Sequence, residues 1–276
     1  MSLRELVCFN AFLFACLCLV SCSPCLADDS KVDGSRTRKG FAEASSETAK
    51  ATRDASLVYL EIQDDAAKMC SIPRLYAPLV SSVWQDTGES VQVTPEQEHW
   101  VIKWKREAVK GKTIVLTFGS RPVMKEEQEP IRAQSDGSYY LPAHHADAFG
   151  EKIRYEPQSY KNTVGYWVGK KDYAVWKLKI EKAGRFNVSI LQGCGKGQGG
   201  SQAEILFSSA AQDKVRKVEF EVLETGHFQD FRWRHLNSIE LPAIEFEVRV
   251  QPKKIAKNAL MDIRAIHLVR LPDPKK

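Results

Sequence analysis

The chain has 276 residues, and its 40 lysines and arginines against 35 aspartates and glutamates give a formal net charge of +5. So small an excess, spread along the chain, argues against a nucleic-acid-binding protein, which would concentrate basic side chains on one face. Five of the seven cysteines precede residue 26, so a disulfide-rich scaffold is excluded and stability must come from a buried apolar core.

The first element is an apolar run over residues 6–20, interrupted by a single Asn. A transmembrane helix needs roughly 20 apolar residues, whereas this shorter run suits the centre of a secretory signal. Residues 1–27 are predicted to be a signal peptide; the sequence LVSC at 19–22 offers the alternative of a lipoprotein signal that ends at Ser21. We expect an exported protein that is periplasmic, on the cell surface or extracellular. Its only membrane attachment would be a lipid anchor on Cys22.

Residues 28–54 contain one aromatic residue, Phe41, and few aliphatic ones. Such a composition buries too little apolar surface to offset the entropy of ordering, so a flexible linker is predicted. Apolar, strand-like segments separated by turn residues then predict a small β-sandwich over residues 55–132. Residues 119–137 are polar and hold two prolines, which is typical of a linker. The expected strands of the sandwich are 57–62, 100–104 and 113–118.

The second half of the chain, residues 137–273, shows a repeated alternation of apolar and charged side chains. This period of two is typical of antiparallel strands with one buried and one solvated face. The predicted fold class is therefore all-β, with a small β-sandwich followed by a jelly-roll β-sandwich. The clearest alternating segments are 176–180, 186–190, 218–222 and 244–250.

No catalytic group emerges from the sequence. Cys194 and His227 lack an orienting third group and an oxyanion hole, so a buried structural thiol is the favoured interpretation. Cys70 falls in the other predicted domain; two free buried thiols are expected, although a pairing of Cys70 with Cys194 stays open.

The loop 193–201 is rich in glycine but lacks the phosphate-loop pattern, and we interpret it as a turn beside a ligand-binding face. Four glutamates lie on solvated strand faces, where solubility explains them: Glu219, Glu221, Glu245 and Glu247.

Several motifs of the second half resemble the jelly-roll, galactose-binding-like modules of carbohydrate-binding families six and thirty-five. The motifs follow in order across about residues 138–272: 162–167 (NTVGYW), 172–176 (DYAVW), 183–186 (AGRF), 225–231 (TGHFQDF) and 260–266 (LMDIRAI). Residues 154–158 and 191–201, with the upstream segments 72–75, 83–84 and 100–102, are similar to the C-terminal β region of bacterial α-L-fucosidases and sulfatases. The catalytic barrel of those enzymes takes about 250 residues and has no room in this chain.

The resemblance to these modules implies a sugar site. The aromatic residue of its "GY" motif falls on Tyr166, with Trp167 beside it, and the Trp of "TGGW" falls on Phe228. The Asn of the last strand falls on Met261. Either the site is altered, with His227, Gln229 or Asn258 supplying the polar contacts, or the module has lost sugar binding. The module's calcium-binding Glu falls on His144, a poor ligand for a hard cation, so no cofactor is expected and a structural calcium is doubtful. His144 and His145 are expected on a strand, pointing to opposite faces in solvent.

The favoured hypothesis is an exported, non-catalytic carbohydrate-binding protein that recognises a polysaccharide or glycoconjugate by aromatic stacking. Two alternatives stay open. The first is a structural or adaptor protein of the cell envelope, or a partner of a glycoside hydrolase or sulfatase. The second is an α-L-fucosidase-family protein that lacks its catalytic barrel.

Overall fold

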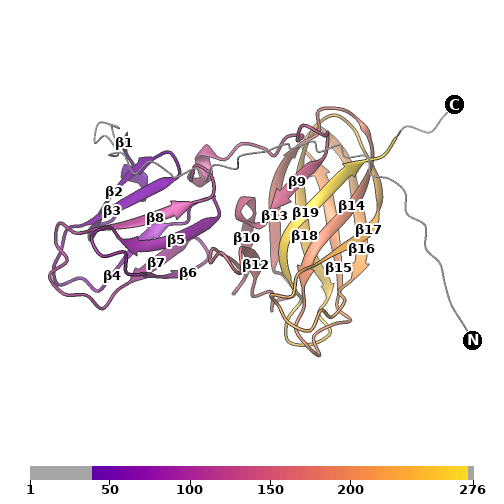
Figure 1. Ribbon diagram of the computed structural model, residues 1–276. Coiled ribbons are helices and arrows are strands. Elements are labelled where there is room, and N and C mark those ends of the chain that lie inside the picture. The colour runs from indigo at the N-terminus through magenta and orange to yellow at the C-terminus, as the bar shows by residue number, and fades with distance from the viewer. Residues whose placement is uncertain (1–38, 273–276) are drawn as a thin grey trace, which may run out of the picture. The chain divides into compact units, whose positions relative to one another are not determined.

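The computed structural model describes residues 39–272, so the apolar run at 6–20 and Cys22 lie outside the described part of the chain (Figure 1). Within residues 39–272 the structure is all-β, which confirms the predicted fold class. Strands are accompanied only by three short 3-10 helices: η1 (Ala42–Ala44), η2 (Lys125–Glu127) and η3 (Ala143–His145). No helix in this range is long and apolar enough to cross a bilayer. All described residues belong to one compact unit.

The N-terminal β-sandwich consists of two antiparallel sheets. One sheet has the strand order β1-β2-β3-β8-β5, and the other has the order β4-β7-β6. Alternate side chains of β3 and β8 are buried between the sheets together with Trp84 and Trp100. The strands are β1 (Lys39–Gly40), β2 (Ala49–Asp54), β3 (Leu57–Ile62), β4 (Met69–Pro73), β5 (Leu79–Trp84), β6 (Gln92–Pro95), β7 (His99–Lys103) and β8 (Thr113–Phe118).

One segment differs from its prediction as a flexible linker. Of residues 28–54, positions 28–38 lie outside the described part, but 49–54 form β2 and pair with β3 from Ala49↔Ile62 to Asp54↔Leu57. The linker prediction is therefore wrong for β2. Small alanines supply the inward face of this strand, since Ala49 and Ala51 are buried, and composition alone undervalues such residues.

The C-terminal jelly roll consists of two larger antiparallel sheets. Their strand orders are β10-β13-β18-β15-β16 and β11-β12-β19-β14-β17, and β9 also pairs with β19. From β16 to β19 each successive strand lies in the other sheet, so residues distant in sequence meet at each end of the sandwich (Figure 1). The strands are β9 (Tyr139–Pro142), β10 (Asp147–Phe149), β11 (Arg154–Glu156), β12 (Thr163–Gly165), β13 (Tyr173–Lys179), β14 (Gly184–Gly193), β15 (Gln202–Ser209), β16 (Gln212–Glu221), β17 (Arg232–Leu241), β18 (Glu245–Lys254) and β19 (Asp262–Arg270).

The core of the jelly roll follows the predicted alternation. On β13, Trp176 and Leu178 are buried, and on β14, Phe186, Val188 and Ile190 are buried. The intervening positions face outward, as period-two strands require. Strand β14 pairs with β17 on one side and with β19 on the other, so its two ends mark the two ends of the sandwich.

The paired histidines also differ from their prediction. His144 and His145 lie on η3 rather than on a strand, because β9 ends at Pro142, which has no N–H for further ladder pairing. Their ring centroids are 4.9 Å apart, and both side chains are partly buried instead of hydrated. Burial lowers the pKa of His144 to about 3.

Candidate functional site

A cavity of about 270 Å³ opens at the end of the jelly roll where β12 ends and β19 begins. Four of the five predicted ligand-binding residues line it: Tyr166, Trp167, Phe228 and Gln229. The cavity is further lined by Met261 and, unexpectedly, by three charged residues, Glu156, Lys161 and Asp262. Three separate loops therefore meet at one site.

Tyr166 forms the exposed wall of the cavity. It follows the last residue of β12 and has a φ of 62°, a left-handed conformation that is uncommon for a bulky residue. This conformation turns the ring away from the strand, and 43% of the residue is exposed. The guanidinium carbon of Arg154 lies 3.5 Å from the ring centroid, so a cation covers one face of the ring. Strain of this kind is typical of binding sites.

Phe228 lies against the glycine-rich loop. A Cβ atom on Gly195 would be 2.6 Å from Cε2 of the Phe228 ring, and one on Gly193 would be 2.0 Å from the Phe228 carbonyl oxygen. Only glycine allows the loop and Phe228 to approach so closely. The glycines of 193–195 thus hold this aromatic ring at the cavity.

Hydrogen bonds fix the loop that carries Phe228 and Gln229. The backbone N–H of Cys194 donates to Oγ1 of the buried Thr225 at 2.8 Å. The N–H of Gln229 donates to Nδ1 of His227 at 3.1 Å, which closes a tight turn around Phe228. His227 therefore has a local structural role, and the side chain of Gln229 lines the cavity.

Two carboxyl groups close around Gly165 at the base of the cavity. A Cβ atom on Gly165 would be 2.9 Å from both Asp262 Oδ1 and Glu156 Oε2, so this glycine admits the carboxyls. Glu156 is paired with Lys161 Nζ. Burial, followed by the nearby charge of Glu156, raises the pKa of Asp262 to about 8. Near neutral pH Asp262 therefore offers a protonated carboxyl that can donate a hydrogen bond, and the Glu156 oxygens beside it can accept one.

The loop that supplies Lys161 is held by Arg264 of β19. The Arg264 guanidinium donates to the Lys161 carbonyl oxygen through Nε at 3.0 Å and through Nη2 at 2.7 Å. Its Nη2 also donates to the carbonyl oxygen of Tyr160 at 2.7 Å. The charged base of the cavity is thus built on the jelly-roll sheet.

Two of the predicted site residues require correction or a different role. Trp167 lines the cavity but is fully buried, and its Nε1 donates to the Val164 carbonyl oxygen at 2.9 Å. A ring without exposed surface cannot stack on a ligand, so its predicted stacking role is wrong. Asn258 is exposed and does not line the cavity, although its neighbour Ala259 does; its N–H donates to Gln198 Oε1 at 3.0 Å.

Glu156 and Asp262 are not among the site residues predicted from the sequence. Asp262 has a signal in the sequence: it stands inside the stretch 259–263, which is otherwise apolar. A charged residue at a buried strand position is costly without a function or a partner. Asp262 is 5% exposed and Glu156 is 3% exposed.

Residues 39–272 contain two cysteines, and neither is placed as a nucleophile. Cys70 and Cys194 are both free and buried. Burial raises the pKa of the Cys194 thiol to about 11, so the thiol is protonated and a poor nucleophile. Among residues 39–272, no group of three or more His, Cys, Asp or Glu side chains is arranged to hold a metal ion.

No family model matches the chain, and no curated protein matches it. Solved structures are similar at low TM-scores. The C-terminal CBM6 of a marine laminarinase from Zobellia galactanivorans has a TM-score of 0.39 and 14% identity, covering 48% of this chain and 99% of that one. A family 35 carbohydrate-binding module from Clostridium thermocellum has a TM-score of 0.34 and 12% identity, covering 52% of this chain and all of that one.

An α-L-fucosidase from Vibrio sp. strain EJY3 is also similar, with a TM-score of 0.33 and 11% identity. The match covers 84% of this chain but 41% of the enzyme, so the chain spans less than half of that protein's length. At such TM-scores and identities these likenesses carry no weight for function, which has to be judged on the residues of the cavity.

Proposed function

We propose that the protein is a non-catalytic carbohydrate-binding protein and that the cavity beside Tyr166 receives a sugar unit of a polysaccharide or glycoconjugate. One observation carries this proposal: an exposed aromatic ring and a buried pair of carboxyl groups line the same cavity. A sugar ring presents a patch of C–H groups to an aromatic face and hydroxyl groups at its edge, and the cavity offers a partner for each.

The polar half of the cavity suits hydroxyl groups because a hydroxyl both donates and accepts hydrogen bonds. Asp262, protonated at neutral pH, can donate to a hydroxyl oxygen, and Glu156 can accept from a hydroxyl hydrogen. The Gln229 amide adds one group of each kind at the rim. These residues take over the role that the resemblance assigns to an Asn, whose position is occupied by Met261.

A glycan array followed by calorimetric titration with the best ligand tests the proposal. Tyr166→Ala is expected to weaken binding about tenfold, the loss of one stacking contact. Tyr160→Ala is the matched control, because Tyr160 is 66% exposed and does not line the cavity. Equal affinities of wild type and Tyr166→Ala for every glycan bound would contradict the proposed site. Turnover of a chromogenic fucoside would favour an enzyme instead.

We also propose that the protein is exported, on the basis of the apolar run at 6–20. Cell fractionation is expected to find it outside the cytoplasm, with its N-terminus at Asp28. Palmitate labelling that Cys22→Ala abolishes would favour the lipoprotein signal instead. Recovery of the full-length chain in the cytoplasm would contradict export.

A further inference from the structure

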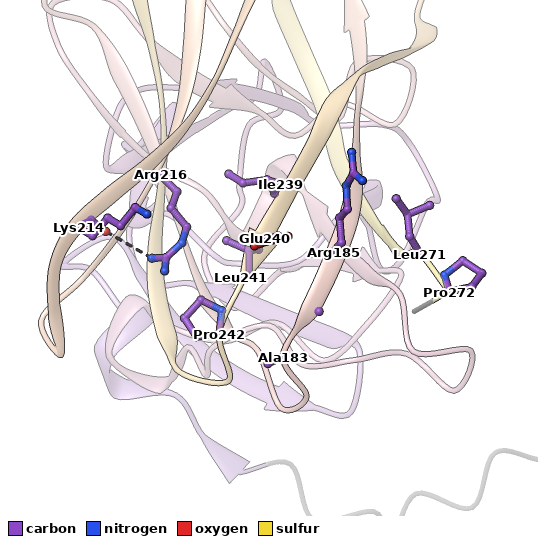
Figure 2. A pocket seen from close by; sticks show the side chains of 11 residues that line it. Ala183, Arg185, Lys214, Arg216, Ile239, Glu240, Leu241, Pro242, Leu271 and Pro272 are labelled. Atoms are coloured by element: carbon purple, nitrogen blue, oxygen red, sulfur yellow. Dashed lines mark hydrogen bonds between the residues drawn. The ribbon is translucent and has the colours of Figure 1, made fainter. Parts of the chain in front are cut away.

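A second hollow lies at the opposite end of the jelly roll (Figure 2). It has a volume of about 740 Å³ and lies beside Arg185, near the start of β14, whereas Gly193, at the end of β14, contacts Phe228 of the first cavity. Nine strand residues at about 3.3 Å each separate the two sites by roughly 30 Å. The hollow is therefore independent of the first cavity.

Cationic side chains dominate the charged lining of this hollow. Lys214 and Arg216 of β16 lie on one side and Arg185 of β14 lies on the other, and Glu240 is the one carboxylate among its lining residues (Figure 2). Arg270 adds a fourth cation at the edge, with Nη2 donating to the Ala183 carbonyl oxygen at 3.2 Å. The whole chain has a formal net charge of only +5, so positive charge is concentrated around this hollow.

The placement of two of these cations breaks the pattern of their strand. Val218 and Phe220 are the buried, inward-facing residues of β16, and Lys214 and Arg216 continue the same alternate positions. Side chains at those positions would normally be apolar. Instead, the exposed Lys214 and the half-buried Arg216 line the hollow together with the buried Ile239 and Leu241 of β17.

We propose that this hollow is a second binding site, for a carboxylated or sulfated polysaccharide. Guanidinium and ammonium groups from two strands match the anionic groups of such a polymer. Leu241, Pro242 and Leu271 supply apolar surface for the C–H faces of its sugar rings. The choice of a glycan rests on the proposed function, whereas the preference for an anion rests on the lining charges alone. A repeating polymer could occupy both sites at once and bind more tightly than a short piece.

Binding of short galacturonate oligomers and of a short sulfated dextran fragment to the full chain tests the proposal. Such fragments are too short to span roughly 30 Å, so they report each site separately. Lys214→Gln/Arg216→Gln is expected to weaken binding at least tenfold, and Arg185→Gln to weaken it less. Whichever fragment binds identifies the anionic group. Lys214→Gln/Arg216→Gln is expected to leave the affinity for the best uncharged glycan unchanged, which separates the second site from the first.

Lys50→Gln/Lys110→Gln is the matched control, because it removes the same charge from two exposed lysines outside the hollow. Equal weakening in control and test variants would show non-specific charge attraction and overturn the proposal. So would binding of neither fragment, or equally tight binding of polyglutamate, which would indicate an acidic peptide.

Inward-pointing charges also protect edge strands such as β16. Self-association of Lys214→Gln/Arg216→Gln with undiminished fragment binding would show that role and overturn the proposal as well.

Discussion

Gly195 shows how a single missing side chain shapes the candidate site. Its Cα lies so close to the Phe228 ring that a Cβ would be 2.6 Å from Cε2. Gly195→Ala is expected to displace the ring, weaken glycan binding several-fold and lower the free energy of unfolding by about 1 kcal/mol, as overpacking does. Titration calorimetry and urea unfolding measure the two effects. Gly40→Ala is the control, since a Cβ there meets nothing within 4 Å; equal behaviour of the two variants would refute the steric role of Gly195.

Asp262 links the base of the cavity to pH. Its pKa is about 8 in the folded protein against an ordinary value of 3.8, so the folded state retains a proton that the unfolded state releases. Stability should therefore fall as pH rises from about 4 to about 8. Asp262→Asn, which mimics the protonated carboxyl, is expected to remove this slope and to be more stable than wild type at pH 8 by several kcal/mol. Chemical unfolding across this range measures it, with the exposed Asp213→Asn as the control; an unchanged slope in Asp262→Asn would contradict the raised pKa.

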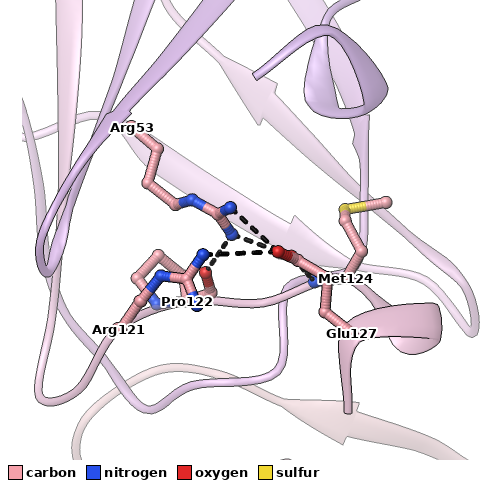
Figure 3. A network of polar contacts seen from close by, with 5 residues as sticks. All are labelled: Arg53, Arg121, Pro122, Met124 and Glu127. Atoms are coloured by element: carbon pink, nitrogen blue, oxygen red, sulfur yellow. Dashed lines mark hydrogen bonds and ion pairs between the residues drawn. The ribbon is translucent and has the colours of Figure 1, made fainter. Parts of the chain in front are cut away.

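At the scale of elements, a polar network ties β2 to the segment that follows β8 (Figure 3). Arg53 donates two hydrogen bonds to the Glu127 carboxylate, at 2.8 and 2.9 Å, and a third to the Pro122 carbonyl oxygen at 2.8 Å. Arg121 and the Met124 N–H complete the surroundings of Glu127. A segment that the sequence indicates is a linker is thereby attached to the sheet.

This network predicts a pH-dependent contribution to stability. The hydrogen bonds from Arg53, and then the Met124 N–H, lower the pKa of Glu127 to about 2 from 4.5. The contribution is thus present above about pH 4.5 and disappears as pH falls towards 2. Because Glu127 is partly exposed, Glu127→Gln is expected to cost only about 1 kcal/mol at pH 7 and nothing at pH 2. Thermal unfolding compares it with the exposed Glu129→Gln; equal effects at pH 7 would refute the network's role.

The elements differ in how far the sequence predicts them. Segments with a strict apolar alternation are found as strands: 186–190 lies within β14, and 218–221 of the segment 218–222 form the end of β16. By contrast, β17 carries Arg232, Arg234 and His235, so no apolar period marks it, and it is a strand because it pairs with β14 along its whole length. Tertiary pairing of this kind overrides local propensity.

At the scale of the whole molecule, the candidate site is only partly encoded in local sequence. Tyr166 and Phe228 could be predicted, because each falls within a motif of the resemblance. Glu156 and Asp262 are 106 positions apart, and only the fold brings both to Gly165. Trp167 could not be distinguished from Tyr166 by residue type, since burial alone separates the core ring from the exposed one.

The extent of the N-terminal sandwich is the point at which fold and sequence disagree most, and it is directly testable. Ala51 of β2 is 1% exposed, whereas Ala42, in the same segment predicted to be flexible, is exposed. Ala51→Lys is expected to cost about 3 kcal/mol or more, because it places an unpaired charge in the core, and Ala42→Lys to cost almost nothing. A flexible linker would tolerate both substitutions equally. Urea unfolding of the two full-length variants decides between these outcomes, and equal midpoints would restore the linker and remove β2 from the fold.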